Sequence, residues 1–157
     1  MKRVLFVCLG NICRSPTAHG VFQHLVNQAG LAHRIEVDSA GTAAYHIGNS
    51  PDPRSTQVAA GRGYDLSPLR ARQAIEQDFD EFDYILAMDA DNLRNLQNIA
   101  PEGYQGHLGL FLAFAGHAGK DVPDPYYGGP EGFDHVLDLV EAASQGLLEH
   151  IQQELKA

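Results

Sequence analysis

The sequence predicts an α/β fold with one four-stranded parallel sheet and helices on both of its faces. Short apolar runs alternate along the chain with segments whose apolar residues recur at helical spacing. Strands that alternate with helices pair in parallel, and both faces of such a sheet are covered. The length of 157 residues suits one core, so we expect a single domain over residues 1–157.

Local composition sets the ends of the elements in the first half of the chain. Four apolar residues from Val4 onward are typical of a buried strand. Gly30 directly follows a helical pattern and suits its C-cap. Ala40-Gly41 closes the second strand, and a loop-like stretch then leads to Pro53. In order, we expect a strand over residues 2–7, a helix over 15–29, a strand over 34–39, a loop over 42–52 and a helix over 53–62.

The second half of the chain repeats this alternation. A buried apolar run ends at Met88, and Asp89 directly after it suits the N-cap of a helix. The acidic residues from Glu76 to Asp83, Asp78 among them, are interpreted as a solvated face. The last helix has an apolar stripe that packs on the core. In order, we expect a strand over residues 83–88, a helix over 90–98, a strand over 106–110, a loop over 116–130 and a helix over 131–155.

Charge and cysteine content restrict the partners and the compartment. The chain has 11 basic and 20 acidic residues, a net charge of −9, which argues against nucleic acid or an anionic membrane as the main partner. No apolar stretch approaches the length of a membrane span, and the run before Gly10 is too short for a signal peptide. Both cysteines lie in one loop, so there is no disulfide framework. We therefore expect a cytoplasmic protein with no nucleic acid partner and no membrane insertion.

The eight residues CLGNICRS that begin at Cys8 carry the most specific chemical signal. They join the first strand to the first helix, where backbone N–H groups bind an anion. The same field favours the thiolate form of Cys8, and the planar guanidinium of Arg14 matches two phosphate oxygens. Gly10 and Asn11 tolerate unusual backbone angles, and Ser15 can donate a hydrogen bond toward the thiolate. The fold prediction therefore includes a phosphate-binding loop after the first strand.

A thiolate that attacks a phosphoester needs a carboxylic acid to protonate the leaving group. The loop DVPDP supplies Asp121 and Asp124, and the two prolines beside Asp124 stiffen its backbone. Because an Asp-Pro pair is also a common turn, the acid role depends on the cysteine loop. In open parallel sheets ligands bind beyond the carboxyl ends of the strands, and Cys8, Ser39 and Asp89 lie at such ends. The eight histidines show no metal-ligand spacing, so we interpret them as core or solvated residues.

These segments together resemble the low-molecular-weight protein tyrosine phosphatases. The motifs occur in order and cover nearly the whole chain: Cys8 to Ser15 followed by Pro16, Asp38 to Thr42, Ala71 to Gln73, Phe82 to Asp89, and Asp124 to Tyr127. The resemblance implies a cysteine-dependent phosphoric monoester hydrolase that acts on phosphotyrosine-bearing proteins or peptides and releases inorganic phosphate. It implies no metal and no cofactor.

The resemblance also implies roles for individual residues. Cys8 attacks phosphorus and forms a phosphocysteine, Arg14 holds the phosphoryl oxygens, and Asp124 acts as acid and then as base. Asn11 and Ser39 brace the loop by hydrogen bonds. The remaining phosphate-binding residues of the loop are Leu9, Gly10, Asn11, Ile12, Cys13 and Ser15.

Two tyrosines match family positions that form the aromatic walls of a deep slot, Tyr45 and Tyr126. A phosphotyrosine reaches the bottom of such a slot, whereas a phosphoserine is too short. For the neighbouring Tyr127 the sequence leaves three alternatives: a residue at the edge of the groove, a phosphorylation site, or a surface tyrosine with no special role. By resemblance, a disulfide between Cys13 and Cys8 protects the nucleophile from over-oxidation and makes the enzyme redox-regulated, and the alternative is that Cys13 only packs the loop.

Three other functions are alternatives to the tyrosine phosphatase hypothesis. A thiol-linked arsenate reductase needs cysteines outside the loop, and this chain has none. The second is a protein-arginine phosphatase. By resemblance, those enzymes have a threonine at the position of Ile12, and their acid loop lacks a pair that matches Tyr126-Tyr127. Ile12 and the two tyrosines therefore favour a tyrosine phosphatase. A non-catalytic phospho-binding module needs no general acid. One departure from the family is that Pro68 stands where a histidine often joins the bracing network.

Overall fold

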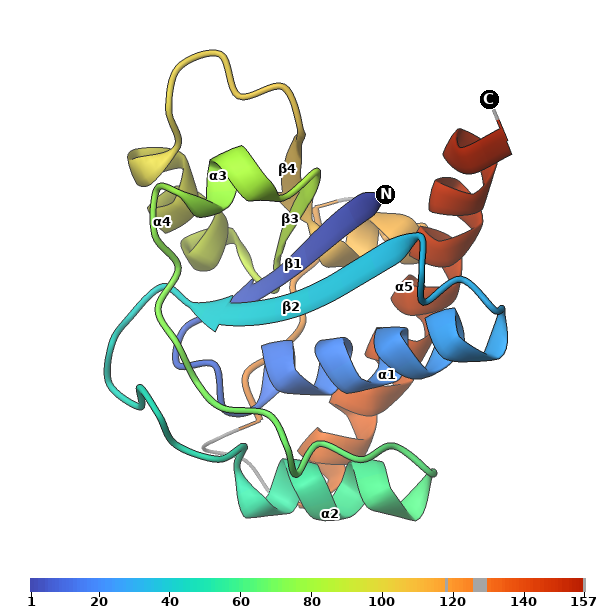
Figure 1. The fold of residues 1–157 in the computed structure, drawn as a ribbon. Helices are drawn as coiled ribbons and strands as arrows, with labels where there is room; N and C mark the ends of the chain where they lie inside the picture. Colours follow the sequence, from blue (N-terminus) through green and yellow to red (C-terminus); the bar gives the residue numbers. More distant parts are fainter. Residues whose placement is uncertain (118, 126–129, 157) are drawn as a thin grey trace.

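Four parallel strands form the centre of the fold (Figure 1). The computed structural model describes residues 1–117, 119–125 and 130–156. Within these residues the strands are β1 (Lys2–Cys8), β2 (Ile35–Gly41), β3 (Tyr84–Ala87) and β4 (His107–Leu110). Their order is β2-β1-β3-β4, and every pairing is parallel, with Val4 between Val37 and Tyr84. The predicted four-stranded parallel sheet is confirmed.

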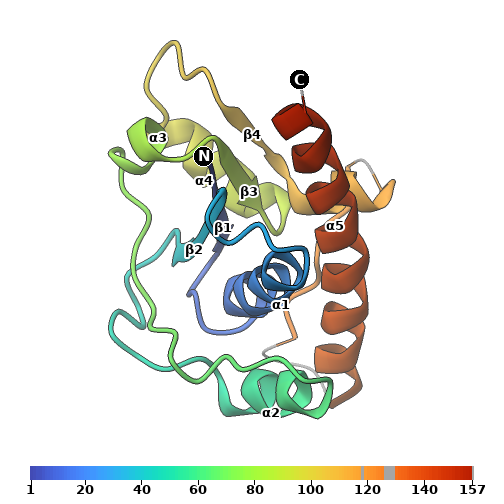
Figure 2. The same cartoon turned by 45° about the vertical axis from the view of Figure 1, so that its right-hand side comes forward.

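Helices cover both faces of this sheet, as predicted (Figures 1 and 2). They are α1 (Arg14–Gln28), α2 (Pro53–Gly61), α3 (Asp78–Glu81), α4 (Ala90–Ile99) and α5 (Pro130–Lys156), with a 3₁₀ helix η1 (Phe111–Ala115) after β4. Alternation along β1 divides the core. Val4 and Phe6 pack with α1 and α5, whereas Leu5 and Val7 pack with the segments around α3 and α4. In the described part of the chain, no helix combines the length and apolarity that a bilayer crossing requires.

Two short helices, α3 and η1, were not expected from the sequence. The interpretation of the acidic run around α3 as a solvated face is wrong for Asp78, which is only 4% exposed. Its carboxylate accepts two hydrogen bonds from the Arg72 guanidinium and one from the backbone N–H of Ile75. These partners compensate for the loss of water, which a charge count along the sequence cannot reveal.

The carboxyl ends of β1 and β2 hold the loop that follows β1. The backbone N–H of Thr42 donates to Cys8 O at 2.9 Å, and that of Ala43 donates to Leu9 O at 3.0 Å. This approach needs a glycine at position 41, because a Cβ on Gly41 would lie 2.7 Å from Leu9 O. On its far side the loop is held by the backbone N–H of Asp52, which donates to the carbonyl of Ile12 at 2.7 Å.

Candidate active site

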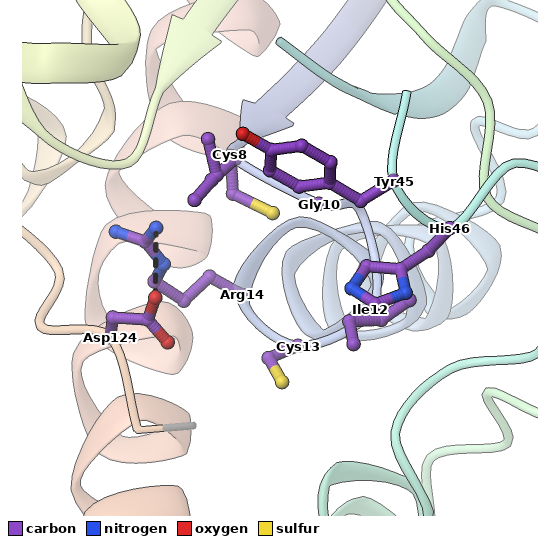
Figure 3. Close-up of a pocket in the computed structure, with 9 residues that line it drawn as sticks. Cys8, Gly10, Ile12, Cys13, Arg14, Tyr45, His46 and Asp124 are labelled. Atoms are coloured by element: carbon purple, nitrogen blue, oxygen red, sulfur yellow. Dashed lines mark ion pairs between the residues drawn. The ribbon is translucent and has the colours of Figure 1, made fainter. Parts of the chain in front are cut away.

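The loop between β1 and α1 forms one wall of a cavity of about 310 Å³ at the carboxyl edge of the sheet (Figure 3). Tyr45 and His46 lie on one side of this cavity, and Arg14 and Asp124 lie on the other. The structure therefore brings together residues that are far apart in the sequence. The cavity is lined by Cys8, Leu9, Gly10, Ile12, Cys13, Arg14, Tyr45, His46 and Asp124.

The sulfur of Cys8 lies within hydrogen-bond distance of a backbone N–H group and of a hydroxyl group. The backbone N–H of Asn11 donates to Sγ at 3.3 Å, and Ser15 Oγ lies 3.0 Å from Sγ. The side chain of Cys8 is buried, so these contacts act where water screens them little. Donors directed at sulfur stabilise a thiolate, which is the nucleophilic form of cysteine.

Asn11 holds the loop in an unusual conformation. Its φ is +58°, in the left-handed region that asparagine tolerates better than most residues. Its side chain is buried and satisfied at both ends, because Oδ1 accepts from the backbone N–H of Arg72 at 3.0 Å and Nδ2 donates to Ser15 Oγ at 2.8 Å. Asn11 thus connects the loop after β1 to the chain that follows α2.

The contacts of Ser39 differ from the expected role as a direct brace of the loop. Its Oγ lies 3.0 Å from His19 Nδ1, on the sheet side of α1. The contact between β2 and the loop is made instead by the carbonyl of Ala40, which accepts from Ser15 Oγ at 3.3 Å. The carbonyls of a strand lie in the plane of the sheet whereas its side chains project from the two faces, so the carbonyl of Ala40 can contact Ser15 when the hydroxyl of Ser39 does not.

Arg14 is held by acidic and carbonyl oxygens although its side chain is only 3% exposed. Nη1 donates to Asp89 Oδ2 at 2.6 Å and to Val122 O at 3.1 Å, and Nη2 lies 3.7 Å from Asp124 Oδ2. Burial alone would lower the pKa of Arg14, but the negative charges of Cys8 and the two carboxylates outweigh burial and raise it. The guanidinium therefore remains charged and fixed in direction.

The two candidate acids of the DVPDP loop are separated by the structure. Asp124 lines the cavity, whereas Asp121 Oδ1 accepts a hydrogen bond from the backbone N–H of Ala90 at 3.0 Å, at the start of α4. Asp89 is the predicted N-cap of α4 and accepts from the backbone N–H of Asn92 at 2.7 Å. Its second oxygen binds Arg14, a role that its position after β3 was not sufficient to predict.

Comparison with known proteins identifies the family. A family model described as low molecular weight phosphotyrosine protein phosphatase matches residues 3–157. The chain belongs to this family. A low molecular weight phosphotyrosine protein phosphatase of Schizosaccharomyces pombe is 48% identical over 152 residues, which cover 95% of this chain and 96% of the relative.

Solved structures of relatives share the fold of this phosphatase. A protein tyrosine phosphatase from Entamoeba histolytica superposes with a TM-score of 0.93 at 39% identity, over 98% of this chain and 99% of that one. A Drosophila arginine phosphatase superposes with a TM-score of 0.89 at 33% identity, over 96% and 98% of the two chains. The fold is therefore shared by a tyrosine phosphatase and an arginine phosphatase and does not by itself decide between the two substrates.

Cys13 lines the same cavity as Cys8, and both are free thiols. Burial, and next the charge of Asp52, raise the pKa of the Cys13 thiol to about 12. Cys13 of this phosphatase is therefore a protonated thiol at neutral pH.

The outer wall of the phosphatase cavity is aromatic. Tyr45 is 74% exposed and lines the cavity, and its ring meets that of His46 edge to face with centroids 6.4 Å apart. His46 was not singled out from the sequence, where its place beside Tyr45 was the available signal, because its contact with the loop arises only in the fold. A Cβ on Gly10 would lie 2.8 Å from His46 Cδ2, so glycine makes room for the imidazole. The predicted second wall residue, Tyr126, and the neighbouring Tyr127 lie outside the described residues.

Proposed function

We propose that this phosphatase hydrolyses phosphotyrosine in proteins or peptides through a phosphocysteine on Cys8 and releases inorganic phosphate. The observation that carries the proposal is the sulfur of Cys8, which lines a cavity and lies close to the backbone N–H of Asn11 and the hydroxyl of Ser15. Arg14 and Asp124 line the same cavity. A nucleophile, a fixed cation and a carboxyl group are the parts that metal-free transfer of a phosphoryl group requires.

In the first proposed step, the Cys8 thiolate attacks phosphorus opposite the tyrosine oxygen. The S–P bond forms as the P–O bond breaks, and the carboxylic acid of Asp124 gives its proton to the leaving oxygen. In the second step, the Asp124 carboxylate takes a proton from water, whose oxygen attacks phosphorus. The S–P bond then breaks, inorganic phosphate leaves, and the thiolate is restored.

Stabilisation of the phosphoryl group is assigned to Arg14 and to the backbone N–H groups of the loop. Positive charge placed before the reaction stabilises the transition state without the cost of reorganising water. Asp89 keeps the guanidinium in place through a bond of 2.6 Å. The ion pair at 3.7 Å between Arg14 and Asp124 is longer, so a phosphate dianion can replace the carboxylate at Nη2.

The aromatic wall supports phosphotyrosine as the substrate. Tyr45 gives the cavity a flat side that can face the ring of a phosphotyrosine, and Ile12 adds an apolar surface within the same cavity. We also propose that residues 1–157 act as one domain in the cytoplasm. The net charge of −9 supports protein rather than nucleic acid substrates.

The test of the chemistry is turnover of two aryl phosphates, p-nitrophenyl phosphate and phenyl phosphate, by wild type and two variants. Cys8→Ser is expected to abolish turnover of both. Asp124→Asn is expected to lower kcat/KM on phenyl phosphate about 10²–10³-fold and to lower kcat/KM on p-nitrophenyl phosphate less, because kcat/KM reports the first step and a good leaving group needs less protonation. Turnover by folded Cys8→Ser at the wild-type rate would place the nucleophile elsewhere, and equal effects on both substrates would remove Asp124 from the acid role.

A further inference from the structure

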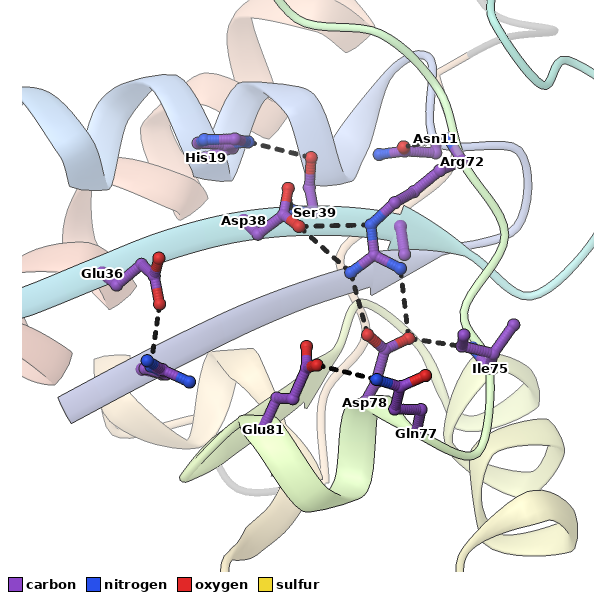
Figure 4. A network of polar contacts seen from close by, with 12 residues as sticks. Asn11, His19, Glu36, Asp38, Ser39, Arg72, Ile75, Gln77, Asp78 and Glu81 are labelled. Carbon is purple, nitrogen blue, oxygen red and sulfur yellow. Dashed lines mark hydrogen bonds and ion pairs between the residues drawn. The ribbon is translucent and has the colours of Figure 1, made fainter.

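An ion cluster of Arg72, Asp38 and Asp78 lies beside the carboxyl end of β2, outside the cavity (Figure 4). The Arg72 guanidinium donates to both oxygens of Asp78, at 3.0 and 3.1 Å, and its Nε donates to Asp38 Oδ2 at 3.1 Å. The side chain of Asp78 is 5% exposed. A two-oxygen contact of this kind fixes both the position and the plane of the guanidinium, unlike a solvated surface pair.

The backbone of Arg72 connects this cluster to the catalytic loop. Its N–H donates to Asn11 Oδ1 at 3.0 Å, and its carbonyl accepts from the backbone N–H of Gly41 at 2.8 Å. Asp78 also accepts a hydrogen bond from the backbone N–H of Ile75. Its carboxylate therefore holds both the side chain of Arg72 and the backbone three residues further on. The side chain of Arg72 therefore anchors a backbone group that the loop uses.

This backbone group determines how the amide of Asn11 is oriented. A carboxamide has an acceptor end and a donor end, and an N–H group can only donate. With Oδ1 bound to the N–H of Arg72, Nδ2 must face Ser15 Oγ, which then accepts. The single hydroxyl hydrogen of Ser15 is left for Cys8 Sγ at 3.0 Å or for Ala40 O at 3.3 Å.

We propose that Arg72, anchored by Asp38 and Asp78, is a positioning residue for the nucleophile. It keeps the donor end of Asn11 toward Ser15 and so keeps the hydroxyl hydrogen of Ser15 available to the sulfur. If the anchor is lost, the amide can turn, its oxygen can accept that hydrogen, and the thiolate loses a donor. The catalytic role of the sulfur rests on the proposed function, whereas the series of hydrogen bonds from Arg72 through Asn11 to Ser15 does not.

The test compares two variants of the anchor with a matched control. Arg72→Lys keeps the charge and the backbone N–H but cannot form the fork, and Asp38→Asn removes the more exposed acidic partner, whose side chain is 41% exposed. Arg62→Gln is the control, because Arg62 also binds several carboxylates, Asp138 and Glu141 among them, but lies in the cluster on α2 and α5 rather than beside the loop.

Two readouts need no turnover: the rate at which iodoacetamide alkylates Cys8 at pH 6, and the concentration of orthovanadate that protects Cys8. For Arg72→Lys we expect alkylation about tenfold slower, protection at about tenfold more vanadate, and kcat on p-nitrophenyl phosphate about tenfold lower. Asp38→Asn is expected to change all three in the same direction and by less. Arg62→Gln is expected to stay within about twofold of wild type.

A purely structural role gives the opposite result for alkylation. Partial unfolding exposes both thiols, so Cys8 would react faster and Cys13 would be labelled as well. That outcome, or wild-type alkylation and protection in both Arg72→Lys and Asp38→Asn, would overturn the positioning role. If Arg72→Lys does not fold, the result for Asp38→Asn decides between the positioning role and a purely structural role. If the wild type shows no turnover, the proposed function fails, while alkylation and protection still test the positioning of the loop.

Discussion

Replacement of Asn11 by alanine tests how the catalytic loop is held. The side chain of Asn11 makes two buried hydrogen bonds, one from the backbone N–H of Arg72 and one to Ser15 Oγ. Its backbone has a φ of +58°. Asn11→Ala removes both hydrogen bonds and leaves in the left-handed region a residue whose side chain has no polar group to stabilise it. Asn11→Gly removes the same bonds, but glycine accepts this backbone conformation.

The expected loss of stability follows from these contacts. Each buried hydrogen bond that loses a partner costs about 1 kcal/mol, and alanine in the left-handed region costs about 1 kcal/mol more than glycine. Asn11→Ala should therefore lower the free energy of unfolding by about 3 kcal/mol, and Asn11→Gly by about 2 kcal/mol. The order of the two variants is a sharper expectation than either value, because glycine is otherwise the more destabilising residue.

Urea unfolding followed by far-UV circular dichroism measures both variants against wild type, since the chain has no tryptophan to report by fluorescence. Equal m-values are the control that the two transitions are comparable. A loss below about 1 kcal/mol for Asn11→Ala would mean that the side chain does not hold the loop. An alanine variant more stable than the glycine variant would refute the argument from the backbone.

Three further predictions concern the thiols, the packing of α5 and the response to pH. Because burial and the charge of Asp52 raise the pKa of Cys13 to about 12, iodoacetamide at pH 7 should alkylate Cys8 first, and equal labelling of Cys13 in peptide mass mapping would contradict this difference. Gly146→Ala should lower the melting temperature, because a Cβ there would overlap with the backbone carbonyl oxygen of Phe114 in η1. The matched variant Gly132→Ala should be tolerated, because its nearest neighbour is 3.6 Å away, and equal melting temperatures would contradict this. Burial lowers the pKa of His19 below 6.5 although Asp38 opposes it, so the unfolded chain binds the proton more readily and stability should fall as pH drops below about 6.5. His19→Gln should flatten this dependence in urea unfolding between pH 8 and 5, and an unchanged slope would exclude His19 as its source.

Local patterns were sufficient for the strands and the long helices. The apolar runs that begin at Val4 and Tyr84 are β1 and β3, and Asp89 caps α4 as predicted. These features depend on a few consecutive residues, so the sequence carries them directly. The helix that ends the chain begins at Pro130, one residue before the predicted start at Glu131, within the usual variation of helix ends.

Contacts between distant segments could not be predicted in the same way. Arg14 and Asp89 are 75 positions apart, and only the pairing of β1 with β3 brings them together. The burial of Asp78 depends on Arg72, whose direction is set by the chain between α2 and α3. His46 was missed for a similar reason, because its place in the cavity depends on the path of the segment after β2 rather than on its own neighbours.

The most direct test of the central claim is kcat/KM on three peptides that differ only in the phosphorylated residue: phosphotyrosine, phosphoarginine and phosphoserine. Cys8→Ser serves as the blank. The account predicts a strong preference for phosphotyrosine, because Tyr45 offers a flat aromatic side to a phenyl ring within the cavity that holds Cys8. A preference for phosphoarginine would keep the chemistry and contradict the substrate, and no turnover of any peptide by folded wild-type protein would contradict the catalytic claim itself.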